Sequence, residues 1–425
     1  MKRFIKTLAA IVATTIVFAT CSNIMDDLKV RPASQPEPTP TPTPAPAPEQ
    51  TPTPTPAPTP APEPSALATP LTLEAVEAGA VVTFSNKAAG PVTYKVNGGA
   101  AQTIAKNSTG TITLEKVGDK VEFFGDNKAY ATSFSNCSNI ACDKDCYVYG
   151  NIMSLVKSDG FENATALEKN CTFAYLFTNN AHIKNKKGAS LLLPATTLAN
   201  NCYQSMFYGC TSLTATPSLP ASTLKDYCYN EMFYGCTSLT AVPELKATTL
   251  ADGCYSCMFQ GCSSLTAAPE LKATTLADSC YSCMFQGCSS LTAAPELKAN
   301  TLANYCYSCM FQGCSSLTAA PSLPATTLAK KCYYYMFSGC ANLTTAPSLP
   351  AATLKEYCYE CMFSGCSKLS NVTCLATDIS AEGCTFEWLS GVAATGTFTK
   401  SASMNNWPTD TPSGIPNGWT VVDKQ

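Results

Sequence analysis

Cysteine is the residue type with the most capacity for chemistry in this chain, and most of its 25 copies recur with a period of 26 residues. Four pairs, among them Cys254 with Cys257 and Cys280 with Cys283, have the Cys-x-x-Cys spacing of zinc and redox sites. The first cysteine of each pair, however, belongs to a column that is present in every repeat. We therefore interpret two columns as structural core: Cys202, Cys228, Cys254, Cys280, Cys306, Cys332 and Cys358, and Cys210, Cys236, Cys262, Cys288, Cys314, Cys340 and Cys366.

The extra cysteines outside these columns are Cys257, Cys283, Cys309 and Cys361. Buried thiols, disulfides between neighbouring units and metal ligands are the three alternatives for them. Disulfide-bonded cysteines need Cα atoms within about 7 Å, which equivalent positions of stacked units approach. A zinc site needs four converging ligands, whereas this chain offers one pair per unit, so no metal site is predicted. The sequence does not decide between thiols and disulfides.

Catalytic side chains are scarce in this sequence. The single histidine, His182, excludes most Ser-His-Asp, Cys-His and multi-histidine chemistry, and we expect it to be a surface or cap residue. Charged residues make up 13% of the chain and the net charge is −3, so no basic field recruits nucleic acid. We predict no catalytic residues, no cofactor and no enzyme activity.

A tyrosine column has two interpretations, a platform that stacks on sugars or core packing against phenylalanine. It consists of Tyr203, Tyr229, Tyr255, Tyr281, Tyr307, Tyr333 and Tyr359.

A second polar set forms the candidate binding face. It comprises Thr214, Thr240, Thr266, Thr292, Thr318 and Thr344, flanked by Glu244, Glu270 and Glu296 and by Lys246, Lys272 and Lys298. This set is either a plain solvated face or a surface that binds an extended partner through many weak contacts. The opposite side is an alternative recognition surface, because one of its positions varies from copy to copy: Gln204, Asn230, Ser256, Tyr334 and Glu360.

The seven 26-residue repeats at 195–376 supply the structural elements that place these residues in columns. Leu198, Cys202 and Met206 stand four apart, which predicts one face of a short helix that ends at Gly209. The segment 213–216 then predicts a short strand. Such a unit buries its apolar face only by stacking on its neighbours. The predicted fold class is an α/β-type solenoid with parallel strands and short helices, preceded by a small all-β module.

The run Met-Phe-x-Gly-Cys-x-x-Leu-Thr, seen here at 258–266, resembles the BspA-type leucine-rich repeat of surface proteins from anaerobic bacteria and spirochaetes. The last copy has Ser370 in place of the threonine, and the tail 414–422 resembles the closing segment of such proteins. The units are longer than usual for that family and lack the L-x-x-L-x-L-x-x-N run. The resemblance implies a cell-surface role in adhesion to host matrix proteins or other microbes.

The remaining segments fit an exported, anchored protein. Residues 1–20 have the charged start and short apolar run of a signal peptide, and Cys21 follows in a box resembling that of bacterial lipoproteins. The segment 21–70 includes a proline-rich linker that favours an extended rod. We expect a small β-sandwich-like module at 71–133, an N-terminal cap with a degenerate repeat at 134–194, and a half repeat with a C-terminal cap at 377–425.

The sequence therefore predicts a lipid-anchored protein of the outer membrane or cell surface that contacts the membrane through its anchor only. Its expected partner is a host extracellular-matrix or cell-surface macromolecule, or another microbe. Two alternatives remain, a carbohydrate-binding lipoprotein for nutrient capture and a structural or antigenic coat protein without a ligand. Adjacent units 247–272 and 273–298 differ only at Gly253 and Ser279, and an additive binding surface tolerates such duplication better than a fixed active site does.

Overall fold

The computed structural model describes residues 64–133 and 135–424. The predicted signal peptide, Cys21 and most of the proline-rich linker lie outside the described residues. No helix among the described residues is long and apolar enough to cross a membrane.

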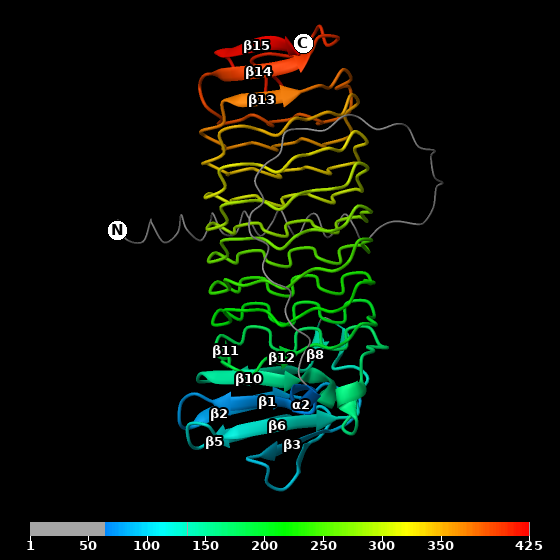
Figure 1. Ribbon diagram of the computed structural model, residues 1–425, viewed down its shortest axis with the longest axis vertical. Coiled ribbons are helices and arrows are strands. Elements are labelled where there is room, and N and C mark those ends of the chain that lie inside the picture. The colour runs from blue at the N-terminus through cyan, green and yellow to red at the C-terminus, as the bar shows by residue number, and fades with distance from the viewer. Residues whose placement is uncertain (1–63, 134, 425) are drawn as a thin grey trace. The chain divides into compact units, whose positions relative to one another are not determined.

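The N-terminal part, up to Leu192, is built from β-strands (Figure 1). Its main sheet has the order β11-β10-β1-β6-β3-β4, and β12 also pairs with β10, while a second sheet has the order β5-β2-β9 and β7 pairs with β8. The strands are β1 (Leu71–Ala75), β2 (Ala80–Ser85), β3 (Val92–Val96), β4 (Gln102–Ile104), β5 (Thr109–Leu114), β6 (Lys120–Gly125), β7 (Ala131–Ser133), β8 (Asn136–Cys137), β9 (Asn139–Cys142), β10 (Cys146–Asn151), β11 (Ile183–Asn185) and β12 (Leu191–Leu192). Strands β1 to β7 fall within the segment 71–133, for which the sequence predicts a small β-rich module.

The core of this part follows the period of two that a half-buried strand requires. In β2 the residues alternate between buried and half-buried, and Phe84 contacts Phe123 of β6 with ring centroids 5.2 Å apart. Strands β9 to β12 lie in the segment 134–194 and complete both larger sheets, while β8 pairs with β7. Since β10 pairs in parallel with β11 and β12, it forms the layer on which the repeats begin.

The repeats form a stack of coils, one 26-residue unit per coil (Figure 1). Their backbone hydrogen bonds alternate between two kinds. The amides of Tyr203, Ser205 and Phe207 donate to carbonyls 25 residues later, in the next unit. The amides of the residues between them donate within the unit, as Met206 does to Tyr203 at 3.2 Å. Half of the backbone in this segment thus makes local turns, and the other half joins neighbouring coils.

The predicted helix of each unit is wrong. Within 195–376, all of which the structure describes, no α-helix forms; the helical segments elsewhere are α2 (Pro64–Leu67), η1 (Ile152–Leu155) and η2 (Phe161–Asn163). Asn201, Ser205 and Gly209 have φ of 58°, 50° and 69°, whereas a helix requires φ near −63° at every residue. A left-handed residue at every fourth position produces successive turns. These turns reproduce the spacing of four that the sequence pattern shares with a helix.

The predicted strand of each unit is also absent. Between 195 and 370, which the structure describes throughout, parallel contacts are single bridges such as Ala215 with Ala241. Regular strands return in a three-stranded parallel sheet, β13 (Asn371–Cys374), β14 (Gly396–Ser401) and β15 (Trp419–Lys424). The described chain is therefore mostly β, with antiparallel and parallel sheets. The predicted class, an α/β-type solenoid with short helices, is overturned.

Two aromatic columns fill the core of the stack. The tyrosine rings of successive units lie 5.8 to 6.0 Å apart and nearly parallel, from Tyr203 to Tyr359. The column continues to Phe173 at one end and to Trp388 at the other. A parallel phenylalanine column runs from Phe177 to Phe363, with neighbouring rings 5.4 to 5.9 Å apart. Each unit is buried by its neighbours, so the repeats depend on one another for stability.

The single difference between the two nearly identical units has a steric reason. Gly253 has φ of +54°, and a Cβ atom there would lie 2.3 Å from Cε1 of Tyr227 in the preceding unit. The equivalent Ser279 has φ of 56°, and the residue 26 positions before it, Gly253, has no side chain. Glycine is therefore required at position 253 because of the Tyr227 ring as well as the positive φ.

We expect Gly253→Ser to lower the free energy of unfolding by about 1–3 kcal/mol, the usual cost of overpacking. Urea denaturation measures it. Ser279→Gly is the matched control and should not lower stability, because glycine adopts a φ of 56° without strain and the buried Ser279 hydroxyl has no hydrogen-bond partner among the described residues. Adding Tyr227→Ala should remove most of the penalty of Gly253→Ser. A penalty that persists without the tyrosine ring would contradict this explanation.

Candidate interaction surface

The first threonine column, Thr214, Thr240, Thr266, Thr292, Thr318 and Thr344, is exposed at every position. The leucine before each threonine is buried, so the column stands on the outer side of an anchored segment. Asn185 of β11 begins the column: its Oδ1 accepts hydrogen bonds from the amides of Thr214 and Ala215 at 2.9 and 3.0 Å. Further along, the Thr240 hydroxyl donates to the Thr214 carbonyl at 3.2 Å. The threonines thus form a regular polar row along the stack.

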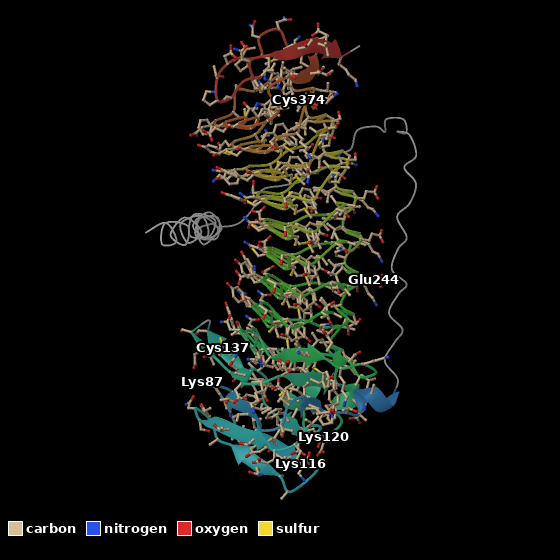
Figure 2. The ribbon with its side chains drawn as sticks, turned by 90° about the vertical axis from the view of Figure 1, so that its left-hand side faces the viewer. Lys87, Lys116, Lys120, Cys137, Glu244 and Cys374 are labelled. Atoms are coloured by element: carbon tan, nitrogen blue, oxygen red, sulfur yellow. The ribbon has the colours of Figure 1, made fainter. Side chains whose placement is uncertain are left out.

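A charge band lies beside this row, formed by Glu244, Glu270 and Glu296 with Lys246, Lys272 and Lys298. Figure 2 shows Glu244 projecting from this flank of the stack. The ion pairs run between units: Lys272 bonds Glu244 at 2.6 Å, and Lys298 bonds Glu270 at 2.9 Å. The hydrogen bond from Lys272 lowers the pKa of the Glu244 carboxyl, and the bond to Glu270 raises the pKa of Lys298. The band therefore neutralises part of its own charge.

A second threonine column was not recognised in the sequence. Each of the seven units carries an exposed threonine directly before a leucine: Thr197, Thr223, Thr249, Thr275, Thr301, Thr327 and Thr353. Parallel bridges join Thr249 to Thr275 and Thr301 to Thr327. No role was predicted for these threonines from the sequence, although a threonine retained in every unit was the available signal. We call the two threonine columns and the charge band between them the threonine flank.

The two cysteine columns lie in the core. In the second column each thiol donates to the carbonyl of a phenylalanine in the preceding unit, as Cys288 does to Phe259 at 3.1 Å. Burial raises the pKa of the Cys288 thiol to about 12, so it is a poor nucleophile. The extra cysteines Cys257, Cys283, Cys309 and Cys361 are buried as well, and no disulfide links cysteines in the described residues.

No group of three or more histidine, cysteine, aspartate or glutamate side chains that could hold a metal occurs in the part of the chain that the structure describes. His182 is half-buried, and its Nδ1 lies 3.3 Å from Oδ1 of Asp145. The imidazole therefore contacts a carboxylate just before β10, next to the hydrogen bond from the Cys146 amide to the His182 carbonyl.

The tyrosine column does not reach the surface. Tyr203, Tyr255 and Tyr307 are each about 1% exposed, because every ring lies between the rings of its neighbours. A sugar cannot stack on rings that are covered on both faces. The structure therefore supports packing, the second interpretation of this column, and leaves the carbohydrate alternative without its platform.

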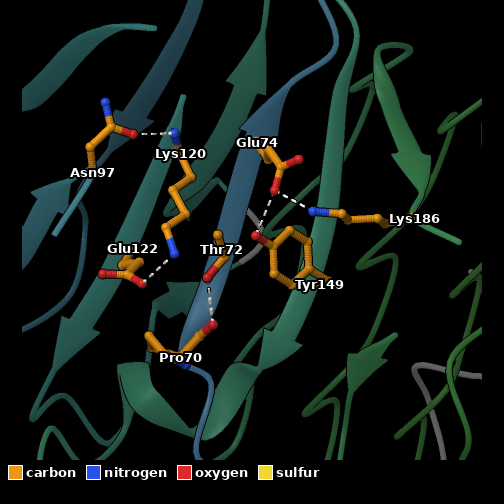
Figure 3. A network of polar contacts seen from close by, with 8 residues as sticks. All are labelled: Pro70, Thr72, Glu74, Asn97, Lys120, Glu122, Tyr149 and Lys186. Atoms are coloured by element: carbon orange, nitrogen blue, oxygen red, sulfur yellow. Dashed lines mark hydrogen bonds and ion pairs between the residues drawn. The ribbon is translucent and has the colours of Figure 1, made fainter. Parts of the chain in front are cut away.

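A polar network joins the N-terminal sheet to the first coil. Glu74 of β1 accepts a hydrogen bond from Tyr149 at 2.8 Å and pairs with Lys186, whose ammonium lies over the Tyr149 ring (Figure 3). Burial opposes ionisation of Glu74, but the bonds from Lys186 and Tyr149 outweigh it and lower the pKa of this carboxyl. Lys186 also lines a cavity of about 180 Å³ between β10 and the first repeat. Since its charge is already paired, we interpret the network as a structural junction.

An acidic column, Asp226, Asp252 and Asp278, runs along another side of the stack. The Asp278 amide donates to Oδ1 of Asp252 at 3.1 Å. Partial burial raises the pKa of Asp252, and the like charges of Asp278 and Asp226 raise it further. A carboxyl whose pKa is higher in the folded state stabilises the fold when protonated, and this contribution is lost as pH rises through the folded-state pKa.

We therefore expect Asp252→Asn to raise the free energy of unfolding modestly at neutral pH, because the amide oxygen can still accept the Asp278 bond. The advantage should shrink as pH falls towards about 4, where the parent carboxyl becomes protonated. Urea denaturation of parent and variant across this range measures it. Asp378→Asn is a control of opposite sign, since hydrogen bonds from Ser380 lower the pKa of Asp378. A variant that is less stable than the parent at neutral pH would contradict the prediction.

No family profile, curated protein or solved structure matches this chain.

Proposed function

We propose that this chain is a cell-surface binding protein that uses the threonine flank to contact an extracellular macromolecule of matrix type or the surface of another microbe. The observation that carries the proposal is the flank itself: exposed threonines repeat in register, in six units in the first column and in all seven in the second, and the ion pairs Lys272–Glu244 and Lys298–Glu270 lie between the columns. Repeated weak contacts along such a row add up when the partner is extended. The role is the one implied by the BspA-type surface proteins that the Met-Phe-x-Gly-Cys motif resembles.

The proposed location is the outer membrane or cell surface, with lipid attached to Cys21 and the proline-rich linker as a spacer. This part of the proposal rests on the signal-peptide pattern and the cysteine after it. Labelling of the full chain with a radioactive fatty acid should depend on Cys21. Equal labelling of a Cys21→Ser variant would reject the anchor.

Binding is tested with the full chain on surfaces coated with collagen or fibronectin, compared with albumin. We expect saturable binding to a matrix protein that falls at least tenfold when Thr266, Thr292 and Thr318 are each replaced by aspartate, since stacked charges are costly to desolvate in an interface. The matched control replaces Ser263, Ser289 and Ser315 by aspartate, three residues earlier in the same units. Equal losses in both variants, or no binding beyond albumin, would reject the proposal. The second outcome would favour a coat protein.

A further inference from the structure

A pair of cysteines outside the repeat columns occupies the turn between the two sheets of the N-terminal part. Cys142 ends β9 of one sheet, and Cys146 begins β10 of the other. Three hydrogen bonds hold the turn between them: Val76 N to Asp145 O at 3.0 Å, Asp143 N to Val81 O at 3.2 Å, and Val81 N to Asp143 Oδ1 at 2.7 Å. The backbone on both sides of the turn is therefore fixed by β1 and β2, and the two thiols are held near one another before any reaction.

The two thiols contact each other and differ in their surroundings. Their side chains share a hydrogen bond, and Nδ2 of Asn180 lies 3.6 Å from Sγ of Cys142. Cys142 is 8% exposed and Cys146 is fully buried. The hydrogen bond from Cys146 lowers the pKa of Cys142, and the hydrogen bond from Asn180 lowers it further. The interaction with Cys142 raises the pKa of Cys146. Cys142 is thus suited to attack a disulfide of an oxidant, and Cys146 is suited to attack the mixed disulfide that results.

The column cysteines are not suited to this chemistry. Cys210, Cys236 and their equivalents are buried, and each already donates its thiol proton to a phenylalanine carbonyl. Burial raises the pKa of Cys236 to about 12. An oxidant that acts through thiolates should therefore reach the pair at β9 and β10 and leave the columns intact.

We propose that Cys142 and Cys146 form a reversible disulfide, with Cys142 as the attacking thiolate and Cys146 as the resolving thiol. The Cys142 thiolate attacks one sulfur of an oxidised dithiol or low-molecular-weight disulfide, forms a mixed disulfide and releases the first thiolate. Cys146 then attacks the Cys142 sulfur, and its proton passes to the departing sulfur, which leaves as the second thiol. Two protein thiols lose two protons and two electrons in total, and the two electrons reduce the donor disulfide to two thiols.

The bond would connect the two sheets at the point where the chain passes from one to the other. Since β10 also carries β11 and β12, oxidation would fasten the layer on which the repeat stack begins.

The test uses the full chain, reduced and then treated with oxidised glutathione in its folded state. We expect peptide mapping to find Cys142 linked to Cys146, with that peptide lighter by the mass of two hydrogens, and the column cysteines still alkylatable after unfolding. Cys146→Ser should accumulate glutathione on Cys142, because the resolving thiol is missing. Cys142→Ser should leave Cys146 as a thiol.

Two results would overturn the proposal. One is that Cys142 and Cys146 both remain thiols while other cysteines, such as Cys137 and Cys171, become oxidised. The other is that glutathione accumulates on Cys146 rather than on Cys142 in the single variants. Circular dichroism of each variant before oxidation shows that it is folded, and the mass of the parent peptide decides the outcome even where a variant is unstable.

Discussion

Deleting residues 273–285, half of one unit, is expected to abolish the single cooperative unfolding transition of the repeats, whereas deleting 273–298 should preserve it. Amides in the stack bond carbonyls 25 residues later, as Phe259 does with Met284 and Tyr281 with Cys306. Removal of a whole unit brings an equivalent residue to every lost position. Removal of half a unit leaves a segment too short to complete a coil, so the aromatic and thiol columns on either side lose their partners.

Thermal unfolding followed by circular dichroism and tryptophan fluorescence measures this effect. Trp388, Trp407 and Trp419 report on the C-terminal end, beyond the deletion, so a transition there that separates from the rest would show a divided stack. The whole-unit deletion is the matched control, because it removes twice as many residues. The prediction fails if the half-unit variant unfolds at the parent temperature in one step.

Replacing Phe285 by alanine is expected to lower the free energy of unfolding by about 3–5 kcal/mol, the usual cost of truncating a buried aromatic residue. The ring is fully buried and lies between Phe259 and Phe311, with centroid distances of 5.9 and 5.8 Å. The cavity would leave both neighbouring rings without a partner on one face, so two interfaces of the stack lose contacts at once.

Urea denaturation with a global fit of the transition measures the loss. Thr292→Ala in the same unit is the control and should stay within about 0.5 kcal/mol, since Thr292 is exposed. If the phenylalanine and threonine variants were equally stable, the packing of the phenylalanine column would not contribute to stability as the structure implies.

The hydrogen bonds of the second cysteine column explain why a chain with so many cysteines is stable without disulfides between them. In each unit the second-column thiol is both a small apolar group and a hydrogen-bond donor to the unit before it, as in Cys314 to Phe285 at 3.1 Å. A disulfide at this position would consume the proton that makes the bond. Cysteine therefore combines packing with satisfaction of a buried carbonyl, and serine or alanine would supply only one of the two.

Some features were predictable because they depend on composition or on spacing along the chain. The period of 26, the burial of Leu213 and of the cysteine columns, and the strands β2, β3, β5 and β6 all follow from patterns that a single segment displays. Apolar residues repeated at the same place in every unit have to be buried by stacking, whatever backbone conformation carries them.

The backbone conformation of the unit was not predictable in this way. Leu198, Cys202 and Met206 at a spacing of four fit a helix and fit successive four-residue turns equally well. The turns are selected by hydrogen bonds between units, since Tyr203 and Ser205 donate to Cys228 and Asn230 rather than to their own unit. The pattern within one unit cannot distinguish a helix from these turns, because the hydrogen-bond acceptors lie in the next unit.

The sequence by itself determined that the chain is repetitive, and it predicted that the two cysteine columns face inward. Only the tertiary structure decided that the units contain turns in place of helices, that the second threonine column is exposed, and that Cys142 and Cys146 meet between two sheets. The physical reason is the range of the interactions. Burial depends on the apolar character of each residue, whereas the hydrogen-bond partners of the backbone and the contacts of these side chains come from segments distant in the sequence.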